Sequence, residues 1–418
     1  NRRVIEALLG ELPKVLPGTV LWAGGPEASC DAETFLETYP GLTGVMCGEG
    51  EGTFSQLIDY YMEGTGALRD IRGIIWRETD GGIRKNQEAE LVDLDQLPFP
   101  YEDLGAFRNK IVYYESSRGC PFRCSYCLSS IEKQVRYRSM PLVKQDLKIF
   151  LEARVPQVKF VDRTFNIDAG RTEELWEWLL EHDNGVTNFH FEIGADRITG
   201  EELKIMSRMR PGLIQLEIGV QSVNPDTIRA VQRTMDLVKL KEAVTRIRGF
   251  QNIHQHLDLI AGLPGEDLES FRHSFDEVFA LKPDQLQLGF LKVLKGTPLY
   301  ERVEDYGIVF RGEPPYEVLR TNWLSYGDLL LLKGVEEMVE VYYNSRQFGR
   351  TLRKILENYE SPFTFFQELA EHYESRGYDK ISHSRMARYE ILREFLESKG
   401  FSLKEFDPCM VYDLYARE

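Results

Sequence analysis

The chain has 418 residues, of which 42% are hydrophobic and 28% charged, and a chain of this length commonly forms about two to four domains. Its formal net charge of −16 at pH 7 disfavours nonspecific attraction to nucleic acids and to anionic membranes. The sequence has no apolar run near the roughly 18 residues that a membrane span needs, and no secretory signal at its start.

The cysteines fall into two groups. Three lie within residues 120–127, and three are scattered, at positions 30, 47 and 409. A secreted disulfide framework would not be distributed in this way, so this usage indicates a reducing, cytoplasmic setting. The sequence starts with Asn1 inside a helical pattern, without a methionine, and we expect its true N-terminus to lie upstream.

Residues 1–70 show an α/β pattern. In order, they contain a helical pattern ending towards Pro13, an apolar strand at 19–23, a second strand at 44–47 and a helix at about 53–62. Each strand runs into glycines. This succession predicts part of a doubly wound domain, and residues 71–110 read as a hairpin followed by a linker.

Strands and helices alternate strictly through residues 111–300. We predict strands at about 111–118, 158–162, 189–195, 213–220, 254–261 and 285–294. Between them we predict helices at 141–153, 171–182, 200–209, 225–249 (broken near 234) and 266–280. Alternation of this kind forces a parallel sheet with right-handed crossovers. Six units make three-quarters of a (β/α)₈ barrel, whose chemistry lies at the carboxyl ends of the strands.

The tail, residues 316–418, reads as a helical C-terminal domain. Two sets of apolar residues recur at the spacing of one helix face: Leu352, Ile355, Leu356 and Tyr359, and then Phe366, Leu369, Ala370 and Tyr373. We interpret both stripes as hydrophobic core.

The three clustered cysteines have the spacing C-x₃-C-x₂-C, formed by Cys120, Cys124 and Cys127. Thiolates at this spacing can bind three corners of one [4Fe–4S] cubane and leave the fourth iron open. The alternatives are a zinc site and a redox-active C-x-x-C pair. Structural zinc takes four ligands, and no fourth Cys or His follows within fifty residues. A redox pair would not need the third cysteine. The motif directly follows the first predicted barrel strand, at the catalytic rim.

With this motif, the predicted barrel resembles the radical S-adenosylmethionine (SAM) superfamily. The resemblance implies that the open iron chelates SAM and that one electron cleaves it to methionine and a 5′-deoxyadenosyl radical. It also implies that Tyr126, just before the third cysteine, contacts the adenine.

Two later segments are similar to the branch that contains oxygen-independent coproporphyrinogen oxidase: residues 219–224, followed by Arg233, and residues 257–265. By that resemblance, Gln221 and Asp258 would bind the SAM ribose and Arg233 its carboxylate. Glu192, on the third strand, would complete the ribose or amino contacts. Each side chain could instead cap a strand end.

Residues 21–29 and 48–54 resemble the cobalamin-binding domain that precedes many radical SAM barrels. Gly24, Gly25, Gly48, Glu49 and Gly50 are the candidate cobalamin contacts, because glycines after a strand allow a ligand close to the backbone. The Asp-x-His-x-x-Gly cobalt-ligand motif of that family is absent, and the first histidine of the chain is at position 182. The resemblance therefore implies cobalamin without a histidine ligand from this segment.

Together these features predict a cobalamin-dependent radical SAM enzyme that methylates an unactivated centre of a small molecule or a peptide. An electron donor such as flavodoxin or ferredoxin would serve it, and neither a membrane nor a nucleic acid is expected as a partner. The first alternative is radical rearrangement, cyclisation or oxidation without methyl transfer.

A second alternative is a tRNA methylthiotransferase. That class needs three further cysteines in its N-terminal domain, where only two are present, and an RNA-binding C-terminal barrel in place of helices. A third alternative is an iron–sulfur redox sensor, which would not need residues for binding SAM.

Overall fold

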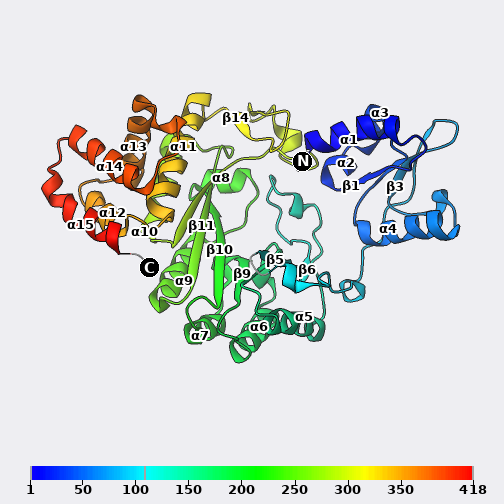
Figure 1. Cartoon of the computed structure of the whole chain (residues 1–418), viewed down its shortest axis with the longest axis horizontal. Helices are drawn as coiled ribbons and strands as arrows, with labels where there is room; N and C mark the ends of the chain where they lie inside the picture. Colours follow the sequence, from blue (N-terminus) through cyan, green and yellow to red (C-terminus); the bar gives the residue numbers. More distant parts are fainter. Residues whose placement is uncertain (1, 108–109, 417–418) are drawn as a thin grey trace. The chain divides into compact units, whose positions relative to one another are not determined.

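The computed structural model describes residues 2–107 and 110–416. Within this part of the chain, no helix is long and apolar enough to cross a membrane. The chain forms two compact units, the first ending at Pro98 and the second beginning at Phe99, and each contains its own main sheet (Figure 1).

The first unit is a four-stranded sheet with helices on both faces. Its helices are α1 (Arg2–Val15), α2 (Pro26–Ser29), α3 (Ala32–Thr38) and α4 (Gly50–Ile58), and its strands are β1 (Trp22–Gly24), β2 (Gly44–Met46), β3 (Ile74–Arg77) and β4 (Ile83–Lys85). Leu36 of α3 packs with Ile75, whereas Leu57 of α4 packs with Ile74. Since neighbouring strand residues point to opposite faces, α3 and α4 cover opposite sides of the sheet.

The strand order in this sheet is β1-β2-β3-β4. Strands β1 and β2 are parallel, as a doubly wound fold requires, and β3 and β4 join them antiparallel. The sequence pattern places the β3–β4 hairpin in a separate segment, residues 71–110. In the structure the hairpin completes the sheet instead, because the backbone of β3 satisfies the open edge of β2.

The second unit is built on a six-stranded parallel sheet in which the strands follow one another in chain order. These are β5 (Ile111–Tyr114), β8 (Gln157–Phe160), β9 (Asn188–Ile193), β10 (Ile214–Gln221), β11 (His254–Ala261) and β12 (Gln285–Phe290). The helices between them are α5 (Met140–Glu152), α6 (Ala169–Glu181), α7 (Gly200–Arg208), α8 (Pro225–Ala230), α9 (Leu237–Phe250) and α10 (Leu268–Ala280). The predicted partial (β/α)₆ barrel is confirmed.

The first barrel strand is shorter than predicted. It leaves the sheet after Tyr114, because the backbone N–H and the hydroxyl of Ser116 both donate to the fully buried Asp162. The chain then forms a separate antiparallel pair, β6 (Ser117–Arg118) with β7 (Arg136–Tyr137). This pair encloses the cysteine motif.

The remainder of the chain is a short hairpin, β13 (Val309–Phe310) and β14 (Val318–Arg320), followed by helices. The helices, gathered together in Figure 1, are α11 (Tyr326–Val339), α12 (Gly349–Leu356), α13 (Pro362–Arg376), α14 (Arg385–Ser398) and α15 (Leu403–Tyr415). The ring of Phe275, in α10, lies 5.5 Å from that of Phe363 and 5.8 Å from that of Phe366. The helical region and the barrel thus share one hydrophobic core.

Candidate active site at the carboxyl ends of the barrel strands

The cysteine motif forms a loop clamped at its base. Gly119 has a φ of +97°, and a Cβ there would lie 2.2 Å from the carbonyl oxygen of Gln134. This position therefore requires glycine. Cys120 and Cys124 are each only 8% exposed, and Cys127 is half-buried. The loop thus holds its three thiols at the edge of the barrel, largely shielded from water.

The three thiols influence one another in a partly desolvated loop. Burial raises the pKa of Cys120, and the neighbouring Cys127 and Cys124 raise it further. Yet no set of three His, Cys, Asp or Glu side chains in the described ranges surrounds a point where one metal ion could bind. In a cubane each thiolate binds a different iron, and a [4Fe–4S] cluster stays the prediction for these three cysteines.

Arg233 connects the cysteine loop to the end of β10. One guanidinium nitrogen, Nη1, lies 3.8 Å from the Cys124 sulfur, and Nη2 donates to the carbonyl oxygen of Gly219. Nearby, the backbone N–H of Ser125 donates to the carbonyl of Val231 at 2.9 Å. Arg233 is thus placed against the cysteine loop, and it does not line the cavity described next.

A cavity of about 390 Å³ lies at the carboxyl ends of the strands. Four of the residues singled out in the sequence line it: Tyr126, Cys127, Gln221 and Asp258. The sequence analysis did not assign the others that carry polar or aromatic groups, namely Ser129, Arg163, Gln287, Phe290 and Lys292. Position in the chain could have revealed two of them, because Arg163 and Lys292 each follow the carboxyl end of a barrel strand, where active-site residues of such barrels lie.

Gln221 has an unusual backbone and a free acceptor. Its φ is +73°, and the register of β10 against β11 shifts between Gly219 and Gln221. A Cβ on Gly219 would lie 2.3 Å from the Gln221 side-chain nitrogen. In the described chain, the buried Oε1 of Gln221 accepts no hydrogen bond. A bulge at a strand end, with an unsatisfied acceptor on a residue that lines a cavity, is typical of a ligand contact.

Two carboxyl groups near the cavity have raised pKa values. Burial raises the pKa of Asp258, although His256, whose Nε2 lies 3.1 Å from the Asp258 Oδ1, opposes the shift. Burial raises the pKa of Glu192 to about 7, and the nearby Glu217 adds to the rise. Glu192 does not line the cavity. It lies 4.0 Å from a guanidinium nitrogen of Arg163, which does.

The interior of the barrel below this cavity is polar. Lys159 Nζ donates to Glu217 Oε2 at 2.9 Å, and His190 Nε2 lies 2.8 Å from the same oxygen. These contacts, His190 foremost, hold the pKa of Glu217 at about 2. This network was not predicted from the sequence. The sequence feature that could have predicted it is the alternation of polar residues along otherwise apolar strands.

The cobalamin candidates of the first unit gather at one edge of its sheet. Gly24 pairs with Met46 in the parallel β1–β2 register, so Gly25 and Gly48, which follow these residues, emerge at the same edge. Both have φ near +85° (86° and 84°). A Cβ on Gly25 or Gly50 would meet no atom within 4 Å. The backbone at this edge is therefore accessible to a ligand, as a doubly wound fold requires.

Glu49 differs from the glycines beside it. Its carboxylate oxygen Oε2 accepts a hydrogen bond of 2.7 Å from the backbone N–H of Val92. The structure thus gives Glu49 a role in holding the segment that follows β4.

Comparison with known proteins agrees with this geometry. Residues 114–278 match the radical SAM superfamily. The chain carries a radical SAM domain. Residues 304–418 match a family described only as a protein of unknown function, DUF4080. The predicted likeness to radical SAM proteins with a helical C-terminal domain of unassigned function is confirmed.

Three relatives extend the match beyond the radical SAM domain. The uncharacterized methyltransferase PH0819 of Pyrococcus horikoshii is 24% identical over 84% of this chain and 74% of its own length. The cobalamin-dependent radical SAM methyltransferase TokK of Streptomyces tokunonensis is 24% identical over 70% of this chain. This chain spans about half (46%) of TokK.

The third relative is a solved structure, the cobalamin-dependent SAM radical enzyme OxsB with aqua-cobalamin and SAM bound. It matches with a TM-score of 0.65 and 17% identity, over 99% of this chain and 68% of that chain. This likeness supports the fold of both units.

Proposed function

We propose that this chain is a cobalamin-dependent radical SAM enzyme that methylates an unactivated carbon or phosphorus centre of a small molecule or a peptide. The observation that carries the proposal is the cavity at the strand ends, where Tyr126 and Cys127 meet Gln221 and Asp258. The Tyr126 ring would contact the adenine and the Cys127 thiol would bind the cluster. The side-chain oxygens of Gln221 and Asp258 would accept hydrogen bonds from the ribose. Similarity to a cobalamin-dependent radical SAM methyltransferase supports the reaction class.

In this proposal Cys120, Cys124 and Cys127 hold the [4Fe–4S] cluster, which supplies the electron for reductive cleavage of SAM. The free Oε1 of Gln221 accepts a hydrogen bond from a ribose hydroxyl. Asp258, beside His256, accepts a second one.

Tyr126 contacts the adenine, and Arg233 pairs with the SAM carboxylate. Arg233 already lies beside Cys124, so a carboxylate bound to the open iron would find a cation next to it. Glu192, in contact with Arg163, faces the amino group. Binding of that cation would favour the charged form of Glu192.

The cobalamin, which supplies the methyl group for transfer, would bind along Gly24, Gly25, Gly48 and Gly50. Gly25 and Gly50 leave the backbone open at one sheet edge, where Gly24 and Gly48 also lie. Glu49 supports this edge through Val92. A small electron-transfer protein, such as flavodoxin or ferredoxin, would reduce the cluster, and we expect no nucleic acid to take part.

The deciding experiment is anaerobic incubation of the reconstituted protein with SAM, cobalamin, a reductant and candidate substrates. Formation of S-adenosylhomocysteine together with 5′-deoxyadenosine supports methyl transfer. Formation of 5′-deoxyadenosine alone contradicts methyl transfer and favours radical rearrangement, cyclisation or oxidation. If neither product forms while the cluster still changes redox state, the protein is a sensor. The Cys120→Ala variant is the matched blank.

Cobalamin binding has its own test. Residues 1–181 contain no histidine, so we expect no histidine nitrogen of this segment to ligate cobalt in the electron-spin spectrum of protein-bound Co(II) cobalamin. Gly25→Val should weaken binding, because φ at Gly25 is +86° and the added side chain would enter the open edge. Gly64→Val, in the same unit and with a φ of +70°, controls for backbone strain alone. Equal losses in both variants would contradict the assignment.

A further inference from the structure

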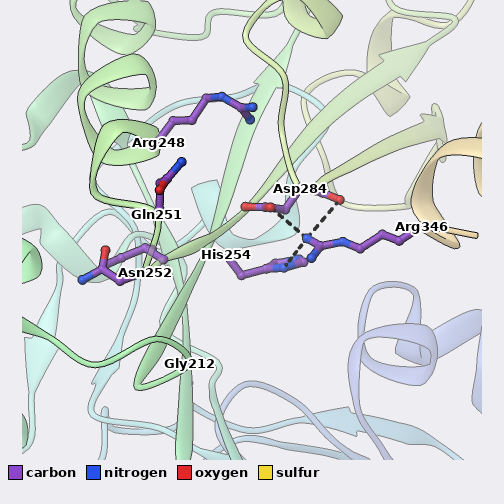
Figure 2. A pocket seen from close by; sticks show the side chains of 8 residues that line it. Gly212, Arg248, Gln251, Asn252, His254, Asp284 and Arg346 are labelled. Atoms are coloured by element: carbon purple, nitrogen blue, oxygen red, sulfur yellow. Dashed lines mark hydrogen bonds and ion pairs between the residues drawn. The ribbon is translucent and has the colours of Figure 1, made fainter. Parts of the chain in front are cut away.

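A second cavity, of about 380 Å³, lies at the other end of the barrel strands (Figure 2). Gly212 precedes β10, His254 begins β11 and Asp284 precedes β12, so the cavity opens at the amino ends of these strands. Along β11, His254 and Asp258 are four residues apart, or roughly 13 Å at the usual rise. This cavity is therefore separate from the candidate SAM site.

Two guanidinium groups reach this cavity from different parts of the chain. Arg248 is in the last turn of α9, whereas Arg346 follows α11 in the region of unassigned function. Figure 2 shows the side chains of Arg248 and Gln251 on one side, and those of Asp284 and Arg346 on the other.

Each guanidinium group is fixed by one nitrogen. Arg248 Nη1 donates to the carbonyl oxygen of Lys282. Arg346 Nη2 lies 2.8 Å from Asp284 Oδ1 and 3.1 Å from His254 Nδ1 (dashed in Figure 2). Within the described residues, the other guanidinium nitrogens of both arginines have no protein partner. These N–H groups remain available to a ligand while the side chains are already oriented.

The lining carries a net positive charge, in contrast to the chain as a whole. Asp284 is the one carboxylate among the residues of the described chain that line the cavity, against two arginines. Burial lowers the pKa of His254, which favours its neutral form near neutral pH, although Asp284 opposes that shift. The chain itself has a net charge of −16. A local excess of cations in an acidic protein favours an anionic ligand.

We propose that this cavity binds a small multivalent oxyanion, a phosphate or carboxylate compound, between Arg248 and Arg346. The planar fork of a guanidinium matches the oxygens of either group in a two-hydrogen-bond arrangement. Gln251, exposed at the rim, adds an amide donor. Because the two arginines belong to the barrel and to the helical region, an anion held by both ties these regions together at the base of the barrel.

The test uses the full-length protein without added cofactors, titrated calorimetrically with pyrophosphate, with citrate, and with sodium chloride at matched ionic strength. We expect saturable binding of at least one of the two multivalent anions and none of chloride. Binding of pyrophosphate alone identifies a phosphate ligand, and binding of citrate alone a carboxylate ligand. The absence of saturable binding by both overturns the proposal.

Two variants locate the site. Arg248→Gln should weaken binding about tenfold or more, the usual scale for losing hydrogen bonds to a charged group. Arg246→Gln removes the same charge from the same helix, but Arg246 is exposed and does not line the cavity. The Arg246→Gln variant should therefore bind the anion with the affinity of the unmodified protein. Equal weakening in both variants would overturn the proposal by showing only a diffuse charge effect. Both variants should retain SAM cleavage, because the cavity lies at the opposite ends of the strands.

Discussion

The two ends of the same parallel strands are built in opposite ways. At the carboxyl ends lie three thiols, an unsatisfied amide oxygen and carboxyl groups whose pKa is raised by burial. At the amino ends, Arg346 pairs with Asp284 and Arg248 with a backbone carbonyl. The carboxyl end holds thiols and buried acceptors, whereas the amino end holds cations that the protein pairs through one nitrogen each and leaves open through the others. This division agrees with the usual separation of catalysis and stability in (β/α) barrels.

The largest expected effect is at the thiols. Replacing Cys120, Cys124 or Cys127 by alanine should abolish SAM cleavage, because each removes one of the three proposed ligands of the cluster. Iron content, the SAM-dependent change of the electron-spin signal and 5′-deoxyadenosine formation measure the loss. Cys409→Ala, in α15, is the matched control and should keep all three. Cleavage like that of the unmodified protein in any of the three variants would remove the cluster assignment.

Alanine substitutions of one glycine at each end of the barrel strands should have opposite effects. Gly119→Ala should prevent cluster assembly, because its Cβ would lie 2.2 Å from the Gln134 carbonyl oxygen at a φ of +97°. Gly249→Ala, in α9 at the amino end, meets no atom within 4 Å. It should stabilise the protein by about 0.5–1 kcal/mol through helix propensity. Iron content and thermal unfolding check both, and normal iron loading of Gly119→Ala would contradict the proposed loop geometry.

A smaller effect is expected at Arg233. Arg233→Ala should weaken SAM binding by about 1.5–3 kcal/mol, the scale of a hydrogen bond to a charged group. Iron content should stay unchanged, since arginine is not a ligand. Arg229→Ala serves as control, because Arg229 is exposed and pairs with Asp226. Equilibrium binding of SAM to the reconstituted variants measures the difference, and an unaltered affinity in Arg233→Ala would refute the carboxylate contact.

The last expected effect concerns pH. Glu266 is fully buried just after β11 and accepts hydrogen bonds from Ser222 and Ser274. Burial raises its pKa from 4.5 to about 7. Because the folded state binds the Glu266 proton more tightly than the unfolded state, this proton contributes to the free energy of unfolding. The contribution is fully present below pH 4.5 and is lost as pH rises through 7. Unfolding of the cofactor-free protein should therefore become easier over this range by about 1–3 kcal/mol.

Glu266→Gln tests this assignment, because an amide keeps the shape of the side chain and does not titrate. Urea unfolding midpoints between pH 4.5 and 8 should lose this part of their pH dependence in the variant. If the two profiles are parallel, Glu266 is not the group responsible. Glu269→Gln, an exposed residue at the start of α10, three positions after Glu266, should leave the profile as it is.

Local patterns were enough to predict the elements and the metal-binding motif. The predicted strands at 254–261 and 213–220 agree with β11 and β10 to within one residue, because alternation and helical periodicity are properties of neighbouring residues. The predicted break near residue 234 separates α8 from α9. Cys120, Cys124 and Cys127 were likewise recognisable, since their spacing in the chain sets their spacing in the loop.

Only the tertiary structure decided which distant residues meet. Arg163 and Lys292 line one cavity although 129 positions separate them, and Arg233 rests on Cys124, 109 positions away. The hairpin β3–β4 was predicted, but its pairing with β2 and the contact between Arg346 and Asp284 leave no local pattern. Periodicity reports on which face of an element a residue lies, whereas such contacts depend on how the elements pack. The sequence by itself therefore determined most of the elements and the spacing of the three cysteines, and packing determined the composition of both cavities.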